Sequence, residues 1–241
     1  MRINVHAGHN PVGKVACGAA GIIHESTEAR RVKDEVIRQL KALGHTVYDC
    51  TCNNGTGQAD VLTKIVTACN AHPVDLDVSI HFNSGAGDTT GNGKTTGIEA
   101  YIYSASSKAK DAAEKVCASI STLGFKNRGV KINTNLYVLR KTKAPAMLIE
   151  CCFVDDKDDV QMYDGQRMAS AIVYGITGQT YTDKSEADTD EEASQAGAET
   201  TIGNNKVIYR VQVGAYAIKG NAEAMREKLN AAGFDAVLVR A

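Results

Sequence analysis

The chain has 241 residues, of which 43% are hydrophobic and 23% charged, a composition typical of a globular protein that buries a large core without disulfides. Lysine and arginine total 27 against 28 aspartate and glutamate. The resulting formal charge of -1 argues against binding to nucleic acid or to an acidic membrane through a general basic field. No apolar run approaches the ~20 residues that a membrane-spanning helix needs, so no membrane span is expected.

The seven cysteines are odd in number and irregularly spaced, which favours free buried thiols over a disulfide framework. This interpretation includes the pairs Cys50/Cys52 and Cys151/Cys152, which we expect to serve as packing side chains. Residues 1–6 begin directly on strand-like sequence, without the apolar segment of a signal peptide. We therefore expect the protein to be made in the cytoplasm and to reach a target outside the membrane only after lysis or release.

Residues 1–178 alternate strand and helix patterns. Short apolar runs predict strands at 3–6, 45–50, 75–82, 98–103 and 146–150. Apolar residues at spacings of three and four predict helices at 25–43, 59–71, 108–123 and 166–175. This alternation predicts an α/β domain with a mostly parallel sheet and helices on both faces. Ligands of such sheets gather at the carboxyl ends of the strands.

The composition changes after this domain. Residues 179–205 carry seven acidic side chains against one lysine and almost no large apolar residue, which predicts a solvated flexible linker. Residues 206–241 then predict a small α+β module, with strands at 207–214 and 234–239 around a helix at 221–232. So short a unit cannot build an independent core. It is therefore part of a larger module, or it is completed by a second chain in a homodimer.

Four residues lie at predicted strand ends or at a helix start, the positions where α/β sheets usually carry their catalytic and ligand-binding residues. His9 follows the first strand, Glu25 opens the first helix, and His81 and Glu150 end two further strands. Two histidines and one glutamate can hold a catalytic Zn2+ with one open position, and a further carboxylate beside it can act as general base and general acid. Histidines at strand ends are more often capping or core residues, so the residue types alone leave both interpretations open.

Several segments resemble the N-acetylmuramoyl-L-alanine amidase family, in its zinc-dependent form from bacterial autolysins and phage endolysins. They are residues 6–10, 21–25, 77–84 and 147–153, supported by 126–129 and 136–139, and the most specific are Ser79-Ile80-His81-x-Asn83 and Ile149-Glu150. The resemblance implies that His9, Glu25 and His81 bind Zn2+ and that Glu150 is the catalytic acid/base. The bond cleaved would be the amide between the muramic lactyl group and L-alanine of peptidoglycan.

Two further residues are candidates for substrate binding. Asn83 belongs to the motif that contains His81, and Arg128 has the planar fork that suits a substrate carboxylate. A surface role explains Arg128 equally well. A glycine-rich loop at 85–97 directly follows Asn83, which predicts a mobile flap at the substrate cleft.

The first motif departs from the family pattern. Many members have Asp-Pro-Gly-His-Gly where this chain has His6-Ala7-Gly8-His9-Asn10. His9 and Gly8 are kept, so metal binding is expected to persist. His6 could support a ligand by hydrogen bonding, serve as an ordinary strand-end residue or compete as a ligand, and we favour the first two.

The tail has a resemblance of its own. Residues 209–216, 221–224 and 229–234 resemble the first half of a SPOR (sporulation-related repeat) domain, a family that binds peptidoglycan. An amidase and a wall-binding module on one chain support each other. Two alternatives remain: a catalytically silent peptidoglycan-binding protein, and a zinc peptidase that cuts within the stem peptide.

Overall fold

The computed structural model describes residues 1–182 and, in the tail, residues 223, 225–227, 229–230, 234 and 236–238. The chain divides into two compact units, Met1–Ala187 and Asp188–Ala241. The predicted linker at 179–205 and the strands at 207–214 and 234–239, with the module that could form a homodimer, fall mainly or wholly outside the described residues. Within 221–232 every described residue is helical, as the pattern predicts. No described helix is long and apolar enough to cross a membrane.

The first unit is built on one six-stranded sheet. Its strands are β1 (Arg2–Ala7), β2 (Thr46–Asp49), β3 (Leu76–Asn83), β4 (Ile98–Ile102), β5 (Asn127–Ile132) and β6 (Ala146–Phe153), in the spatial order β2-β1-β3-β6-β4-β5. The four strands β2, β1, β3 and β6 run parallel, β4 is antiparallel to β6, and β5 is parallel to β4. The predicted mostly parallel sheet is confirmed.

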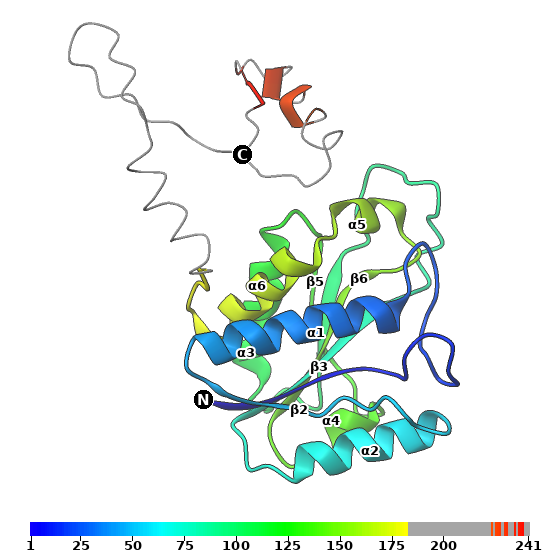
Figure 1. Ribbon diagram of the computed structural model, residues 1–241, viewed down its shortest axis with the longest axis vertical. Helices are drawn as coiled ribbons and strands as arrows, with labels where there is room; N and C mark the ends of the chain where they lie inside the picture. The colour runs from blue at the N-terminus through cyan, green and yellow to red at the C-terminus, as the bar shows by residue number, and fades with distance from the viewer. Residues whose placement is uncertain (183–222, 224, 228, 231–233, 235, 239–241) are drawn as a thin grey trace, which may run out of the picture. The chain divides into compact units, whose positions relative to one another are not determined.

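Helices cover both faces of this sheet, as predicted. They are α1 (Glu25–Ala42), α2 (Gln58–Asn70), α3 (Lys110–Ser121), α4 (Tyr137–Lys141), α5 (Lys157–Met162) and α6 (Gly165–Thr177). Figure 1 shows α2 and α4 together on one side of the sheet, with α1 and α6 on the other. The larger core lies under α1, α3 and α6, and a smaller one lies under α2 and α4.

The alternation of side chains along the strands decides which residues can meet at a site. In β1, Ile3, Val5 and Ala7 belong to the larger core, so His6 points to the opposite face, toward α2. The same period of two makes Ile80 and Phe82 of β3 face the larger core while His81 does not. The α2 side of the sheet therefore collects the polar strand residues that the sequence singled out.

Three elements were not predicted: β5, α4 and α5. Strand β6 also runs three residues past Glu150, so Cys151 and Cys152 lie inside the strand rather than beyond its end. All seven cysteines are free, and all except Cys17 are buried, as expected for packing side chains.

The glycine-rich loop between β3 and β4 is tied to the turn after β6. Asp155 accepts hydrogen bonds from the backbone N–H groups of Gly85, Ala86 and Gly87, at 2.9, 3.3 and 2.9 Å. Asp158 Oδ2 accepts from those of Asn92, Gly93 and Lys94, at 2.7, 2.8 and 3.2 Å. These bonds anchor the loop at several points, which corrects the expectation of a freely mobile flap.

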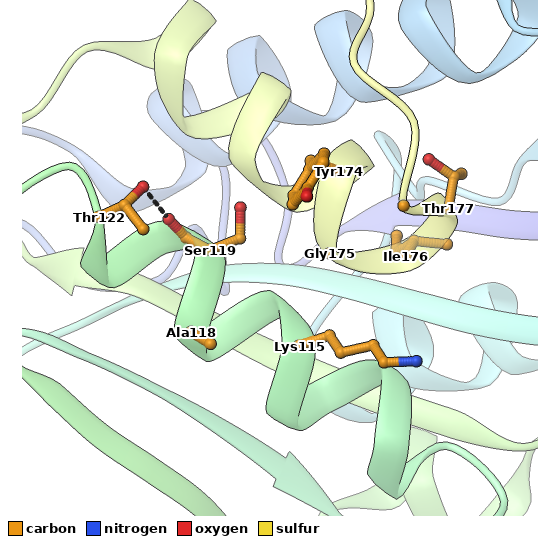
Figure 2. Close-up of a pocket in the computed structure, with 9 residues that line it drawn as sticks. Lys115, Ala118, Ser119, Thr122, Tyr174, Gly175, Ile176 and Thr177 are labelled. Atoms are coloured by element: carbon orange, nitrogen blue, oxygen red, sulfur yellow. Dashed lines mark hydrogen bonds between the residues drawn. The ribbon is translucent and has the colours of Figure 1, made fainter.

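Helices α3 and α6 pack closely at Gly175. A β-carbon on Gly175 would lie 2.5 Å from the Cα of Val116, so only glycine permits this contact. Beside it is a surface hollow of about 480 Å³ between the two helices, with Tyr174 at its edge (Figure 2). None of the four residues of the predicted catalytic set lines this hollow.

Candidate metal centre

His9, Glu25 and His81 meet at the carboxyl end of the parallel strands. Each offers one ligand atom, and these atoms lie within 4.8 Å of one another. Glu25 Oε1 is 2.9 Å from His81 Nδ1 and 3.3 Å from His9 Nε2. Ligand atoms around a tetrahedral zinc with bonds of 2.0–2.1 Å stand about 3.3 Å apart. The identity and spacing of the three side chains are therefore compatible with a bound zinc ion.

Two glycines make room for this cluster. A β-carbon on Gly8 would lie 2.0 Å from His81 Cε1, and one on Gly18 would lie 2.5 Å from Glu25 Oε2. Gly18 also has a φ of +81°, and His9 itself has a φ of +63°, a conformation that is uncommon outside glycine. The loop between β1 and α1 thus accepts local strain where it presents His9.

Glu25 is fixed by backbone donors as well as by the histidines. The N–H of Ala19 donates to Oε2 at 2.7 Å, and the N–H of Phe82 donates to Oε1 at 3.2 Å. The side chain of Glu25 is only 5% exposed. Burial opposes its ionisation, but the hydrogen bonds from His81 and His9 outweigh burial and hold the pKa of Glu25 well below its usual range. Glu25 is therefore an anion, as a metal ligand must be.

Arg30 holds the loop that carries His9, a role the sequence did not reveal. Its guanidinium donates to the backbone carbonyls of His9 at 2.7 Å, Cys52 at 3.0 Å and Gly8 at 3.3 Å. It also donates to the carbonyl of Ser26, within its own helix α1, at 2.9 Å. Arg30 therefore ties the His9 loop to both α1 and the segment after β2.

Glu150 lies beside this cluster without joining it. In the pairing of β3 with β6, Glu150 stands directly opposite His81. Its Oε2 is buried and has no hydrogen-bond partner among the described residues. Burial, followed by the charges of Glu25 and Glu99, raises the pKa of Glu150 to about 8 in the metal-free protein. An unpartnered carboxyl in a cleft, with a raised pKa, is the profile of a general acid or base.

All four residues line one cleft of about 370 Å³. Its far wall comes from α2 and from the segment leading into α4, with Gln58, Val61, Leu62, Ile65, Asn135, Leu136, Tyr137 and Val138 as lining residues. Residues 136–139 belong to the segments that carried the family resemblance. In the structure, residues of this segment line the cleft across from His9, Glu25 and His81.

His6 and Asn10, which depart from the family pattern, have separate roles. His6 is 1% exposed and lines the cleft but does not belong to the metal-binding group. Burial, with a smaller effect of His81, lowers the pKa of His6 to about 3, so it is neutral. Asn10 is fully buried and exchanges two hydrogen bonds with the backbone of Gly55, at 2.8 and 2.9 Å. Asn10 therefore closes the loop behind His9.

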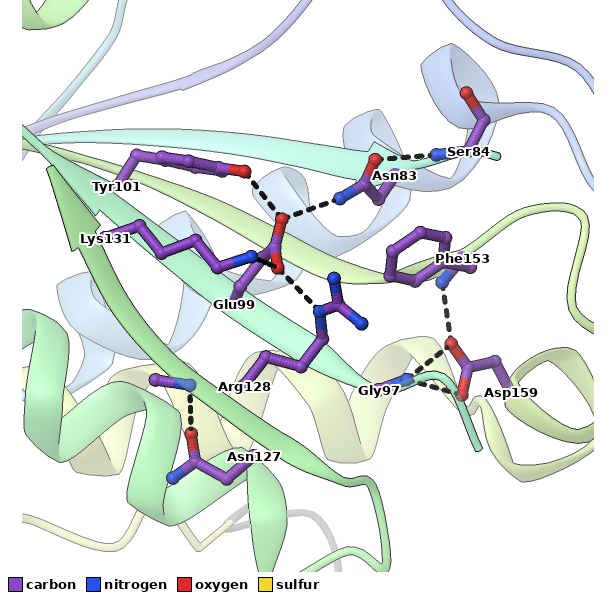
Figure 3. A network of polar contacts seen from close by, with 11 residues as sticks. Asn83, Ser84, Gly97, Glu99, Tyr101, Asn127, Arg128, Lys131, Phe153 and Asp159 are labelled. Atoms are coloured by element: carbon purple, nitrogen blue, oxygen red, sulfur yellow. Dashed lines mark hydrogen bonds and ion pairs between the residues drawn. The ribbon is translucent and has the colours of Figure 1, made fainter. Parts of the chain in front are cut away.

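The two candidate substrate-binding residues, Asn83 and Arg128, both contact Glu99, a residue that the sequence analysis did not single out. Asn83 Nδ2 donates to Glu99 Oε1 at 2.9 Å, and Arg128 Nε donates to Glu99 Oε2 at 2.6 Å (Figure 3). Asn83 lines the cleft, whereas Arg128 lies beyond its lining. The sequence feature that could have identified Glu99 is a carboxylate between two apolar residues of a predicted strand, Ile98 and Ala100.

A second acidic group consists of Asp88, Asp156 and Asp158. Asp156 Oδ2 accepts from the N–H and hydroxyl of Thr96, and Asp158 Oδ2 accepts three backbone N–H groups of the glycine-rich loop. These bonds assign the two carboxylates to the anchoring of the loop.

Comparison with known proteins identifies the family. A family model described as N-acetylmuramoyl-L-alanine amidase matches residues 3–178. The chain belongs to this family. A SPOR domain model matches residues 180–240, directly after the amidase domain. The more detailed boundaries at 179–205 and 206–241 stay predictions.

Individual curated proteins and solved structures are also similar to this chain. An uncharacterized protein of Clostridium perfringens is 38% identical over 68% of this chain and 47% of its own length. The endolysin of Bacillus phage SPP1 is 30% identical over 70% of this chain and 60% of its own length. The chain thus spans less than two thirds of the length of either relative. Among solved structures, the catalytic domain of the CD27L endolysin, which targets Clostridia difficile, is 26% identical, with a TM-score of 0.67 over 76% of this chain and 99% of that one.

Proposed function

We propose that this protein is a zinc-dependent N-acetylmuramoyl-L-alanine amidase that hydrolyses the amide between the muramic lactyl group and L-alanine of peptidoglycan. The observation that carries the proposal is the juxtaposition of an unpartnered Glu150 carboxyl with the His9, Glu25 and His81 ligand set in one cleft. Family membership supplies the substrate class, and the matched SPOR domain fits a protein that binds peptidoglycan.

The residues present fit zinc. Two neutral imidazoles and one ionised carboxylate are a ligand set of catalytic zinc sites. When bound, zinc supplies a Lewis acid that polarises the scissile carbonyl and activates water for attack. Glu150 stays close to Glu25, and a dication held by His9, Glu25 and His81 would offset their repulsion and favour the ionised form of Glu150.

Glu150 then performs the proton transfers. As a carboxylate it accepts a proton from the attacking water, and as a carboxylic acid it delivers that proton to the amine of the departing L-alanine. Its unpartnered Oε2 is free for this exchange because no described protein group donates to it. The cleft between these residues and the wall formed by α2 and residues 135–138 is the space that would receive the substrate.

The place of action follows from the proposed substrate. Peptidoglycan lies outside the cell membrane, so we propose that the enzyme made in the cytoplasm reaches it after lysis or release. Fractionation of producing cells before and after lysis tests this step, because wall-bound enzyme is expected only afterwards.

The proposal is tested by digesting purified peptidoglycan and identifying the products by mass spectrometry. A free muramic lactyl carboxyl, together with a new amino terminus on L-alanine, is expected. A chelator should abolish this release and added zinc should restore it, with about one zinc per chain by elemental analysis. His81→Ala should lose both zinc and activity. His72→Ala, two residues past the end of α2 and outside the cleft lining, should keep both.

Other outcomes contradict the proposal in distinguishable ways. New amino termini only within the stem peptide, with the lactyl amide intact, would identify a zinc peptidase. Wall binding without release of any product by the zinc-loaded protein would identify a catalytically silent peptidoglycan-binding protein.

A further inference from the structure

A row of functional side chains extends from the metal centre across the sheet. His81 of β3 is paired with Glu150 of β6, and Glu150 is paired with Glu99 of β4. Directly opposite residues of neighbouring strands place their side chains on the same face. Glu99 therefore stands on the face that carries the catalytic set, one strand further out. Adjacent strands are separated by about 4.8 Å.

The next strand contributes Arg128 through a break in its register. Strand β5 pairs Asn127 with Ile98 and Val130 with Ala100, so two residues of β5, Arg128 and Gly129, stand against the single residue Glu99. Gly129 adopts a φ of +78°, which glycine accepts without strain. Such bulges turn a side chain away from the direction that regular pairing gives it. Here the bulge accompanies the contact between Arg128 and Glu99.

Glu99 is the hub of a saturated network (Figure 3). Its Oε1 accepts from Asn83 Nδ2 at 2.9 Å and from the Tyr101 hydroxyl at 2.6 Å. Its Oε2 accepts from Arg128 Nε at 2.6 Å and from Lys131 Nζ. Glu99 is 2% exposed. Both oxygens have two donors each, so Glu99 has little capacity left to receive a substrate or a metal.

Arg128, in contrast, has hydrogen-bond donors that are not used within the described part of the chain. Only its Nε is used, and neither terminal nitrogen of the guanidinium has a hydrogen-bond partner among residues 1–182. The guanidinium lies over the ring of Phe153, 5.1 Å from its centroid, and the side chain is 30% exposed. Glu99 on one side and Phe153 on the other thus hold a planar fork whose free edge can bind a carboxylate through two parallel hydrogen bonds.

We propose that Glu99 is a positioning residue that holds Arg128 to bind a free carboxylate of the stem peptide beyond L-alanine. This inference rests on the proposed function of the cleft and deepens it. Two cations, Arg128 and Lys131, against one Glu99 leave a surplus positive charge at this end of the row. Asn83, which lines the cleft and donates to Glu99, connects the two places.

The distances suit a peptide held across the strands. Strands β6 and β5 are separated by two strand spacings, or about 10 Å. An extended peptide covers about 3.3–3.6 Å per residue. A carboxylate on the second or third residue of the stem peptide can therefore reach Arg128 while the amide before L-alanine lies at Glu150.

The test compares muramoyl tripeptides that differ only in whether the carboxylate of the second or of the third residue is free or amidated. For the zinc-loaded wild type, amidation of the recognised carboxylate should raise KM on the order of tenfold to a hundredfold, the usual worth of a charged hydrogen-bonded pair. In Arg128→Ala the preference for the free carboxylate should vanish, while the free and the amidated peptide both remain substrates. Arg167→Ala, an exposed arginine on α6, should keep the preference.

The role of Glu99 is measured by the same comparison, expressed as the ratio of the KM of the amidated peptide to the KM of the peptide with the free carboxylate. Glu99→Gln keeps the shape of the side chain but removes the charge that holds Arg128, so it should reduce the ratio toward one. In an Arg128→Ala background it should change the ratio no further. Arg128→Lys should restore only part of it, because an ammonium cannot make two parallel bonds. Equal KM values for all peptides with the wild type, or an unchanged ratio in Arg128→Ala, would overturn the inference.

A binding measurement separates this inference from the proposed reaction. Calorimetric titration of zinc-loaded Glu150→Gln with the same peptides needs no turnover. A carboxylate preference that depends on Arg128 supports the subsite even if the wild type cleaves nothing. Cleavage without such a preference supports the amidase and rejects the subsite.

Discussion

Gly8 lies directly against the imidazole of His81: a β-carbon on Gly8 would come within 2.0 Å of His81 Cε1 and 2.3 Å of Nε2. The backbone supports this approach, since the N–H of Gly8 donates to the carbonyl of Ile80 at 3.0 Å. The loop that presents one proposed ligand, His9, is therefore packed against the side chain of another, His81. The two histidines cannot be positioned independently, and the absence of a side chain at Gly8 is a condition for both.

Gly8→Ala is expected to displace His81 and to abolish high-affinity zinc binding while the domain stays folded. The new methyl group meets a side chain rather than a main chain, so the imidazole can turn away from the metal. Zinc content by elemental analysis and activity should both fall more than about tenfold. Gly57→Ala is the matched control, because Gly57 has extended backbone and a β-carbon added there would meet nothing within 4 Å. A Gly8→Ala protein with full zinc content would contradict the packing argument.

Arg30→Ala is expected to weaken zinc binding although Arg30 touches no metal ligand atom. The variant removes donors to the carbonyls of Gly8, His9 and Cys52 and leaves the His9 loop free to move. Loss of such supporting contacts usually costs about 10- to 100-fold in metal affinity. Competition with a fluorescent zinc chelator measures it. Arg31→Ala, the next residue, whose side chain is 71% exposed, should bind zinc normally. Equal affinities for both variants would refute the role of Arg30.

Local patterns were enough to predict most of the sheet and to place four candidate residues at the ends of its elements, whereas their roles as metal ligands and acid/base came from the family resemblance and stay predictions. The apolar runs of β1, β3 and β6 and the helical spacing in α1 locate the strand and helix ends where His9, Glu25, His81 and Glu150 stand. Strand β5 carried no such signal, because Asn127–Ile132 is polar and partly exposed at the edge of the sheet. The five-residue helix α4 is too short for a helical period to appear.

Contacts between distant segments set the limit of sequence reasoning at the site. Arg30 acts on carbonyls that lie 21 and 22 residues away, and Glu99 takes its partners from β3 and β5. Nothing in the residues near Arg30 or Glu99 indicates these partners. The glycine-rich loop is a similar case: its glycines suggested mobility, whereas its fixed course depends on aspartates about 65 residues further along the chain.

Asp158→Ala is expected to loosen the glycine-rich loop. Three backbone N–H groups, of Asn92, Gly93 and Lys94, lose their common acceptor, and each lost bond to a charged group is worth about 1.5–3 kcal/mol where it is buried and less in this exposed setting. Limited trypsin digestion should then cut after Lys94 several times faster than in the wild type. Asp111→Ala, an exposed aspartate on α3, provides the control. An unchanged cleavage rate would mean that the other contacts hold the loop without Asp158.

Glu150→Gln is expected to separate catalysis from stability. Loss of the general acid/base should lower kcat by about 10²- to 10⁴-fold while zinc is retained, since Glu150 is outside the metal-binding group. In the metal-free protein the same change should stabilise the fold at high pH. Burial raises the pKa of Glu150 from 4.5 to about 8, so between these values the folded state binds more protons than the unfolded state. The stability of the wild type must therefore fall as pH rises through this window.

Glutamine cannot ionise, so the stability of Glu150→Gln should lack that decline. Thermal unfolding of the chelated proteins at pH 5 and pH 9 measures the difference. The melting temperature of the variant, relative to wild type, should rise by at least about 2–4 °C between the two pH values, which corresponds to roughly 1 kcal/mol for a domain of this size. Glu114→Gln, whose side chain is 54% exposed on α3, should show no such gain. A pH-independent difference between Glu150→Gln and wild type would mean that Glu150 is ionised in the folded metal-free protein at neutral pH.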